Sequence, residues 1–425
     1  LETHDQILTD RLGEILGLTL MDVHGQIGEQ KFDFGMRSVD ERVGIVLQTE
    51  DGAERLDDNY GGRALKMAIG ELHPSALYKR DKRRYVVTSV STDDYASHQL
   101  RKAIDRAIVP SEIQEVGCMN CGFSADAELW SCPECGSELK QIDPMVMTRV
   151  EAVDAEVQMS YRNETPVTDL LSEGGKRVRS TYARPESSVI SFQADETYIL
   201  MDGAGGRLGT IEWGPMEVFV YAAGYKRKFM DGSVDPSQNR FEMCGVEGCD
   251  GVVYRTAEAA GCTQSKAHDP DDPDAPSTIA YMGMLLETAG VRVDLDDHIA
   301  AHTLAHGLRV GLQYLAGVDI RMVGESVGSD DSVYVFDDQQ GGAAVTEMLF
   351  RRDAEGTLGI EEALDLIYDH FDCPCDGGCP NCVYQRGCDV RDYVSELDPA
   401  VVRQWWTDGS PHLEGDVGQG PRSGS

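Results

Sequence analysis

Basic residues are scarce in this sequence. It carries 38 Lys and Arg against 74 Asp and Glu, a formal net charge of −36 over 425 residues. Such a charge repels itself and any phosphate backbone in dilute buffer. In molar salt the Debye length falls to about 3 Å, so the repulsion is screened and hydrated carboxylates keep the surface soluble. We therefore interpret the acidity as a halophilic adaptation to a salt-rich cytosol, and not as a site for a basic partner.

Long apolar runs and a secretion signal are also lacking. No stretch approaches the roughly 20 apolar residues of a membrane-spanning helix, so we expect a cytoplasmic protein with no membrane partner. In that reducing compartment the twelve Cys favour metal ligation over disulfides. The chain begins at Leu1 with no Met, in mid-pattern, which suggests a processed or truncated product and the tail of a longer polypeptide.

A nucleotide-binding motif is absent as well. Gly174-Gly-Lys-Arg177 has the glycines and lysine of a phosphate loop, but Arg177 stands where Ser or Thr must bind magnesium. The Gly-rich stretch 203–209 is interpreted as a turn, because no helix with phosphate-facing amides follows it. We assign no catalytic residue to this chain and expect it to contain no ATPase motor.

Cysteines are instead concentrated in three groups. The densest has five thiols within residues 373–388, separated by glycines and prolines that interrupt helix and strand hydrogen bonding. Closely spaced thiolates on tight turns can converge on one zinc ion, which takes four such ligands at about 2.3 Å. One thiol is then spare, and a disulfide or free thiols are the alternative. The five candidates are Cys373, Cys375, Cys379, Cys382 and Cys388.

The second group consists of two Cys-x-x-Cys pairs, Cys118 with Cys121 and Cys132 with Cys135, separated by ten residues. Each pair bends back to offer both sulfurs to one ion, so the spacing predicts a zinc ribbon. A zinc ribbon binds nucleic acid or protein, or only stabilises a subdomain whose core is too small to fold without metal.

The third group is Cys244, Cys249 and Cys262, with His268 downstream. This spacing is acceptable for a zinc site of three cysteines and one histidine, and the alternative is that the thiols are buried as small hydrophobic groups. The acidic, proline-containing stretch 269–274 that follows is interpreted as a stiff linker at a domain boundary.

Two short basic runs stand out against the acidic composition. Bases beside aromatic rings are what the phosphates and base faces of a single strand require, so both runs predict nucleic-acid contact. The alternative is a solvated hairpin tip. The first run, between Tyr78 and Tyr85, is Lys79, Arg80, Lys82, Arg83 and Arg84; the second, between Tyr225 and Phe229, is Lys226, Arg227 and Lys228.

Apolar periodicity predicts an α+β, multidomain fold. The predicted domains are a β-rich domain with helices (1–110), a zinc ribbon (111–145), a β-rich region with the third cysteine group (146–276), an α/β domain ending in the Cys-rich knuckle (277–407) and a disordered tail (408–425). Helices are expected in 1–30 and over 64–69, 98–113, 279–286, 299–315, 360–368 and 401–406. Strands are expected over 32–37, 43–47, 153–157, 189–192, 198–201, 218–221, 318–323 and 333–336, with a hairpin over 78–90.

The run Cys373-Pro-Cys-Asp-Gly-Gly-Cys-Pro-Asn-Cys-Val383, with a further Gly-Cys at 387–388, resembles the C-terminal zinc-binding domain of MrfA-like helicases. These are superfamily-2 (DEAD/DEAH-type) DNA-repair motors, and the same domain occurs without a motor in phage-defence (DISARM) components. The resemblance implies Cys373, Cys375, Cys379 and Cys382 as zinc ligands, with Cys388 as the extra one. The element order of residues 30–95 is similar to the segment that follows the motor in this family.

Two further stretches carry the resemblance. Ala301-His-Thr-Leu-Ala-His306 is similar to the His-containing helix of the same domain, and we favour a packed or hydrogen-bonded pair of His302 and His306 over metal ligands. Residues 336–344 resemble the family's Asp-x-x-Pro-Gly-Gly-x-Gly turn, with Ala344 in place of the last Gly. We interpret Asp337 as structural, since a single carboxylate does not hold a catalytic magnesium.

Two functions follow as hypotheses. In the first, the chain is the zinc-bearing C-terminal region of a DNA-repair helicase and contacts DNA, single-stranded or forked, beside a motor in the same polypeptide. In the second, it is a standalone, non-catalytic subunit that partners a separate helicase in phage defence. A zinc protein that binds only other proteins is a third, weaker option.

Overall fold

The computed structural model describes residues 42–415, and they belong to one structural unit, Glu41–Ser425. The gaps within this range are residues 50–51, 57–62, 75, 81–82, 107–114, 119–122, 127–128, 156–158, 161–162, 165–171, 174–175, 237–238, 245–250, 254–276, 329–330, 355, 376–377, 380, 384–387 and 389–396. The helix predicted in 1–30 and the strand predicted over 32–37 lie outside the described residues.

One long strand, β19 (Ser277–Leu295), connects the two halves of the described fold. Its second half pairs antiparallel with β15 (Arg207–Ala222) from Met282 to Leu295. Its first residues pair parallel with β8 (Leu139–Ala155). One continuous strand therefore pairs with both halves. The predicted domain boundary at residue 276 comes directly before this strand, and the first residues of the strand hydrogen-bond to the β-rich region.

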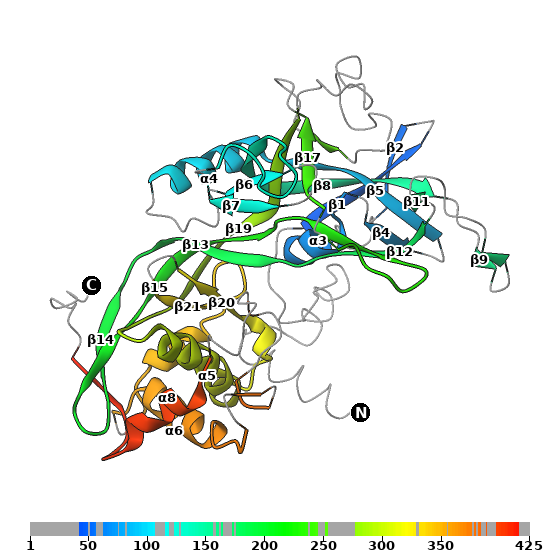
Figure 1. Cartoon of the computed structure of the whole chain (residues 1–425). Helices are drawn as coiled ribbons and strands as arrows, with labels where there is room; N and C mark the ends of the chain where they lie inside the picture. Colours follow the sequence, from blue (N-terminus) through cyan, green and yellow to red (C-terminus); the bar gives the residue numbers. More distant parts are fainter. Residues whose placement is uncertain are drawn as a thin grey trace, which may run out of the picture. The chain divides into compact units, whose positions relative to one another are not determined.

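A small barrel forms at the β-rich end (Figure 1). The hydrogen-bonded order β19–β8–β5–β18–β17 returns to β19 and closes the ring. The new members are β5 (Arg83–Thr92), β17 (Phe241–Cys244) and β18 (Gly251–Val253). Closure leaves no edge in this ring of strands, which is the usual reason that small β-rich folds form barrels.

Alternation along β15 distributes its side chains between two apolar cores. Val218 and Val220 join a core that also contains the apolar face of α3 (Leu65–Glu71). Phe219 and Tyr221 point to the opposite face and pack in the core beneath α4 (Asp94–Arg106). This period of two is what a strand buried on both faces requires.

A helical layer covers the other end of the sheet (Figure 1). There α5 (His298–Ala316), α6 (Gly359–His370) and α8 (Pro399–Arg403) share a core with β14 (Glu196–Met201), β15, β19, β20 (Val323–Val327) and β21 (Val333–Asp337). The Asp297 carboxylate caps the first turn of α5, and Gly317 ends the helix in the left-handed region at φ 64°. The same core contains Cys382 and Val383, so the Cys-rich segment is part of the packing.

The remaining elements are short strands and turns. The strands are β1 (Arg42–Thr49), β2 (Gly52–Arg55), β3 (Arg63–Ala64), β4 (Leu77–Arg80), β6 (Glu115–Cys118), β7 (Ser124–Asp126), β9 (Met159–Ser160), β10 (Asn163–Glu164), β11 (Ser172–Glu173), β12 (Lys176–Ala183), β13 (Glu186–Phe192), β16 (Tyr225–Phe229) and β22 (His412–Glu414). The 3-10 turns are η3 (Ile320–Met322), η4 (Thr346–Phe350) and η5 (Gln404–Trp406). The predicted α+β class, rich in strands with few helices and with a Cys cluster near its end, is confirmed.

The helix predicted over 279–286 is wrong, because these residues belong to β19. A short, continuous apolar run does not distinguish a buried helix from a strand buried on both faces. The residue that indicates a strand here is Gly283. A Cβ there would lie 2.3 Å from the Val220 carbonyl oxygen of the neighbouring strand, so only Gly allows this close approach.

Two other expectations also differ from the structure. The strand predicted over 318–323 begins only at Val323, because the Asp319 carboxylate accepts a hydrogen bond from the Arg321 amide and favours the turn η3. Residues 412–414, in the predicted polar tail, form β22 and pair with β14. Among the described helices, none has the length and apolar character needed to cross a bilayer.

His73, which follows α3, is fully buried in the β-rich core. Its ring stacks on Tyr225 at 4.9 Å, and its Nδ1 donates to the Pro74 carbonyl at 2.8 Å. The Nε2 atom has no hydrogen-bond partner among the described residues. Burial lowers the pKa of His73 from 6.5 to about 4, and the bond to Pro74 offsets only part of this effect. His73 is therefore neutral in the folded chain.

We expect stability to fall between pH 6.5 and pH 4 because of this residue. The unfolded chain binds a proton at His73 below pH 6.5 and the folded chain only below about pH 4, so protons favour unfolding in that window. The full effect is about 3 kcal/mol. Urea unfolding at constant salt should show a smaller loss from pH 7 to pH 4.5 in His73→Leu than in the wild type. Parallel pH profiles would contradict the assignment.

Candidate metal centres and basic surface

Four thiols of the C-terminal segment converge just after the end of α6. The Cys373 and Cys379 sulfurs are 3.6 Å apart, those of Cys375 and Cys382 3.5 Å, and those of Cys379 and Cys382 3.7 Å. A tetrahedron of sulfurs at the usual Zn–S distance of about 2.3 Å has edges of about 3.8 Å. The four sulfurs therefore stand at the spacing that a single zinc ion requires.

Backbone amides of the knuckle point at its sulfurs. The amide of Cys379 donates to Cys382 Sγ at 3.2 Å, and the amide of Asn381 donates to Cys379 Sγ at 3.4 Å. The second bond lowers the pKa of Cys379 to about 7, which favours the thiolate that a metal needs. Burial raises the pKa of Cys382 to about 12, so that thiol ionises at neutral pH only with a cation beside it.

The predicted ribbon brings together the three of its thiols that are described. Cys118 ends β6, Cys132 and Cys135 lie on the turn before β8, and their sulfurs all lie within 4.8 Å of one another. Backbone bonds close both loops, from the Cys118 amide to the Phe123 carbonyl and from the Cys132 amide to the Ser137 carbonyl. Hydrogen bonds from Ser137 lower the pKa of Cys135 to about 6. This geometry fits one metal ion held by two knuckles.

For five of the predicted metal ligands the structure does not describe the side chain. Cys121, Cys249, Cys262 and His268 lie outside the described residues. For Cys244 the structure describes the backbone, in β17, but not the side chain. The third cysteine group therefore stays a prediction.

The fifth thiol of the C-terminal segment, Cys388, lies against a different set of side chains. Its sulfur is 3.4 Å from His302 Nε2 on α5 and 3.8 Å from Glu325 Oε1 on β20. The Nε2 atoms of His302 and His306 are each 2.9 Å from Glu325 Oε1. Burial alone would raise the pKa of Glu325, but His306, His302 and Arg309 hold that pKa well below its usual range.

Sequence reasoning missed Glu325. No spacing rule connects a single carboxylate on a short strand to a helix that ends nine residues earlier, at Ala316. The available signal was a charged residue in the apolar strand Val323-Gly-Glu-Ser-Val327, since acidic residues are rarely buried without a partner.

Asp337 organises the turn after β21. Its carboxylate accepts hydrogen bonds from the amides of Ala343 at 2.8 Å, Val345 at 3.1 Å and Thr346 at 2.8 Å, and the residue is fully buried. Three residues of the turn have positive φ: Gly341, Gly342 and Ala344. Three buried amides bonded to one carboxylate support the structural interpretation of Asp337.

The two basic runs are brought together by the fold. Leu77 of β4 and Val86 of β5 pack in a small apolar cluster with Val178 of β12 and Phe229 of β16. β4 and β5 form the predicted hairpin, with Tyr78 opposite Tyr85 and Lys79 opposite Arg84. Runs that are far apart in the sequence thus lie on strands of two different sheets whose apolar side chains pack together. The side chains of Lys79, Arg80, Arg83 and Arg84, and all of Lys82, lie outside the described residues.

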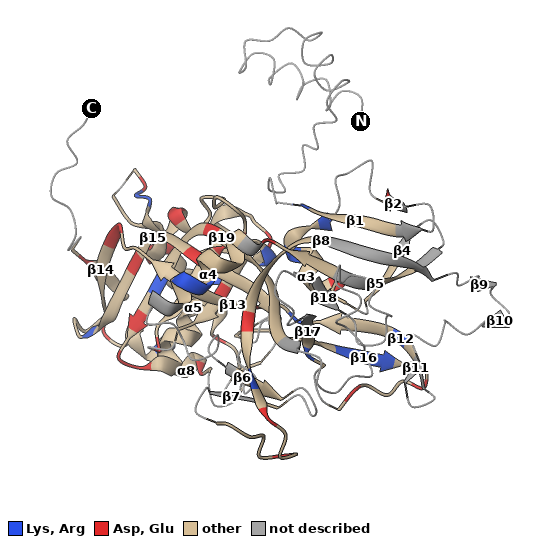
Figure 2. Cartoon of the chain, turned by 90° about the horizontal axis from the view of Figure 1, so that it is seen from above, with Lys and Arg blue, Asp and Glu red and all other residues tan. Residues whose placement is uncertain are grey.

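The second run lies on β16, where Figure 2 shows basic residues beside β12. Lys228 is exposed and Lys226 is half-buried. Arg227 is bound within the protein: its Nε donates to Asp235 Oδ2 at 2.9 Å, and its Nη2 donates to Asn239 Oδ1 at 3.2 Å. Of this run, the two lysines are therefore the better candidates for contact with an external phosphate.

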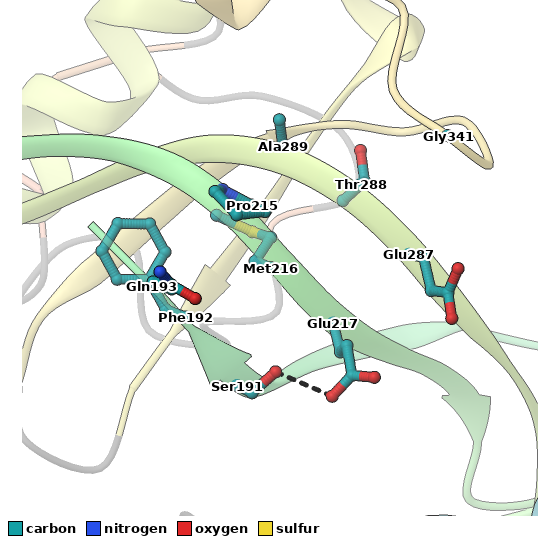
Figure 3. Close-up of a pocket in the computed structure, with 10 residues that line it drawn as sticks. All are labelled: Ser191, Phe192, Gln193, Pro215, Met216, Glu217, Glu287, Thr288, Ala289 and Gly341. Carbon is teal, nitrogen blue, oxygen red and sulfur yellow. Dashed lines mark hydrogen bonds between the residues drawn. The ribbon is translucent and has the colours of Figure 1, made fainter. Parts of the chain in front are cut away.

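A shallow cavity of about 690 Å³ lies over β13, β15 and β19 (Figure 3). Glu217 and Glu287 face each other across β15 and β19 at its edge, and Ser191 donates to Glu217 at 2.7 Å. Two carboxylates at one edge repel a phosphate, so this cavity is a poor place for a nucleic-acid backbone.

Comparison with known proteins places one part of the chain in a family. Residues 300–383 match the family model described as the MrfA Zn-binding domain. The segment is similar to an MrfA Zn-binding domain. It runs from the first turn of α5 to the residue after Cys382, and the resemblance seen in the knuckle is thereby confirmed. A search of curated proteins finds no match.

A search of solved structures finds matches to MrfA with low TM-scores. One is described as the DUF1998 helicase MrfA bound to DNA, with 11% identity over 87% of this chain and a TM-score of 0.38. A second, MrfA bound to DNA and AMPPNP, gives 13% identity over 86% of this chain and a TM-score of 0.35. The alignments cover 34% and 32% of those chains, so this chain spans about a third of the length of MrfA.

Proposed function

We propose that this chain is a zinc-binding region associated with a superfamily-2 DNA helicase and that it contacts a DNA strand during repair. A motor, in the same polypeptide or in a partner, would hydrolyse ATP. Zinc ions held by the four-cysteine knuckle and the ribbon would supply folding free energy and no chemistry of their own.

The match of residues 300–383 to the MrfA Zn-binding domain carries this proposal. MrfA is described as a helicase bound to DNA, and a chain with its zinc-binding domain is expected to act beside such a motor. The knuckle supports the same conclusion, because its sulfurs have the spacing of a closed structural site with no position left for a substrate.

The joined basic runs are the candidate DNA surface. In a chain with a net charge of −36, most of the surface repels phosphates, and a strand needs a local positive region. The cluster of Leu77, Val86, Val178 and Phe229 holds the hairpin β4–β5 beside β16, and aromatic residues flank both runs. Aromatic rings next to bases suit a single strand, whose bases can stack.

Replacing Lys226 and Lys228 by Ser is expected to weaken binding to a single-stranded oligonucleotide by about tenfold at the lowest salt at which the chain stays folded. Each lost phosphate contact lowers the slope of log K against log salt by about 0.7, so the slope should fall as well. Fluorescence anisotropy measures both quantities. A variant with Ser at the five hairpin bases should behave in the same way.

The matched control removes two basic residues elsewhere, Arg321 and Arg351, whose side chains are 84% and 60% exposed. It changes the net charge by the same amount, so affinity should stay near the wild-type value. If the control weakens binding as much as the lysine variant does, overall charge and not a local surface governs binding. Unchanged binding in both lysine and hairpin variants would assign the runs to solubility.

A further inference from the structure

We propose that His302, His306, Glu325 and Cys388 bind a second metal ion of the zinc class, beside the four-cysteine knuckle but separate from it. The proposal depends on neither DNA binding nor the knuckle. It replaces the expectation that the two histidines are only packed or hydrogen-bonded, because the fold surrounds them with two ligand-type groups from distant parts of the chain.

The four ligand atoms are already close enough to share an ion. The Nε2 of His302, the Nε2 of His306, a Glu325 oxygen and the Cys388 sulfur all lie within 4.8 Å of one another. Around a tetrahedral zinc, with ligands at about 2.0–2.3 Å, neighbouring ligand atoms stand about 3.3–3.8 Å apart. The observed N–O and S–N distances of 2.9 Å and 3.4 Å are close to this spacing, so small movements suffice.

Hydrogen bonding fixes which nitrogen of His306 faces the cluster. Its Nδ1 lies 2.6 Å from the Val383 carbonyl oxygen, which can only accept, so Nδ1 carries the proton. In the neutral ring Nε2 then carries a lone pair and lies 2.9 Å from Glu325 Oε1. Two lone pairs at that distance repel unless a proton or a metal ion lies between them. A backbone carbonyl bound to the far nitrogen is the usual support of a metal-bound histidine.

The charges of the cluster suit a divalent ion. Arg309 donates to Glu325 Oε2 at 3.1 Å and offsets one negative charge, which leaves Oε1 toward the histidines. Two imidazoles, one carboxylate oxygen and one thiolate form a mixed donor set that zinc accepts. The Arg184 guanidinium also donates to the Cys388 carbonyl, which anchors the ligand-bearing segment to the turn between β12 and β13.

Burial distinguishes a structural site from a catalytic one. His302 and His306 are fully buried, Cys388 is 1% exposed, and the Glu325 side chain is 5% exposed. A catalytic zinc keeps one position open to water or substrate, whereas four protein ligands in a closed cluster stabilise the fold. The ion would join α5, β20 and the segment after the knuckle, because His306 also bonds to Val383, the residue after Cys382.

The alternative is a metal-free cluster in which a protonated histidine pairs with Glu325. Metal analysis of the purified full chain separates the two. Cys388→Ser and His302→Gln should each contain one zinc ion fewer than the wild type, and the double variant should lose no more than either single one, since both residues hold the same ion. Cys135→Ser should lose a different ion, that of the ribbon, so its loss should add to that of Cys388→Ser.

The matched control is His298→Gln, which changes the histidine one turn earlier on the same helix and outside the cluster, and it should keep its zinc. Circular dichroism identifies variants that stay folded. Folded Cys388→Ser and His302→Gln proteins with wild-type zinc content would overturn the proposal. If both fail to fold, anomalous diffraction at the zinc edge from wild-type crystals decides: a peak among the four side chains supports the ion, and its absence removes it.

Discussion

A chain with Cys379 and Cys382 replaced by Ser is expected to lose the knuckle's metal ion and to unfold from α5 to α8, which would also release an ion held by His302 and His306. Zinc binding at a structural site contributes about 10–16 kcal/mol at neutral pH, which matches or exceeds the roughly 5–15 kcal/mol of a whole domain. Cys382 and Val383 pack in the core of the helical layer. Two helices depend on the knuckle directly, because His306 bonds to the Val383 carbonyl and His370 bonds to the Cys382 carbonyl at 2.8 Å.

Hydrogen exchange followed by mass spectrometry measures this effect element by element. Amides of α5 and α6 should lose their protection in the double variant, while those of the barrel strand β5 should keep most of it. The control is Cys135→Ser, which removes a ligand of the ribbon and should leave α5 and α6 protected. Full protection of α5 and α6 without the knuckle's ion would show that the apolar core alone holds them.

Replacing Asp337 by Ala is expected to destabilise the chain by about 3–5 kcal/mol. Its carboxylate binds three backbone amides in a fully buried turn, and Ala would leave all three without an acceptor. Loss of the turn would also release η4, whose Leu349 packs in the helical core. Thermal unfolding at constant salt, with the metal content unchanged, measures the loss.

The control for this prediction is Asp202→Ala. Asp202 accepts from the amides of Ala204 at 3.0 Å and Gly206 at 2.6 Å, but those bonds lie in an exposed turn, where water replaces the lost acceptor. Its cost should be about 1 kcal/mol. If Asp337→Ala costs no more than Asp202→Ala does, the buried carboxylate does not hold the turn together.

Patterns of short range could be predicted from the sequence. The spacing of the C-terminal thiols, the capped helix α5 and the hairpin β4–β5 each depend on residues within about twenty positions. Local chemistry determines them. Tight turns bring thiolates together, Asp297 caps the start of a helix, and the alternation of apolar and polar residues is typical of a strand. The four sulfurs of the knuckle accordingly lie where the motif implies.

Relations between distant residues could not be predicted. Whether the run 279–286 is helix or strand depends on β15, whose Val220 carbonyl approaches Gly283. Arg227, which was predicted to contact nucleic acid, instead forms an ion pair with Asp235 within the fold. Nothing in the run Tyr225–Phe229 indicates this ion pair. Glu325 and Cys388 meet His302 only through tertiary packing, which no spacing rule represents.

Metal ions are proposed to hold the cysteine-bearing segments of this fold in place. The ratio of zinc to sulfur in the purified full chain, by plasma mass spectrometry, tests this directly, because the 12 Cys and 15 Met provide an internal count of chains. We predict at least two zinc ions per chain from the knuckle and the ribbon, and a further one from the His302–Cys388 centre. A chain that is folded in high salt with fewer than two zinc ions would contradict the account.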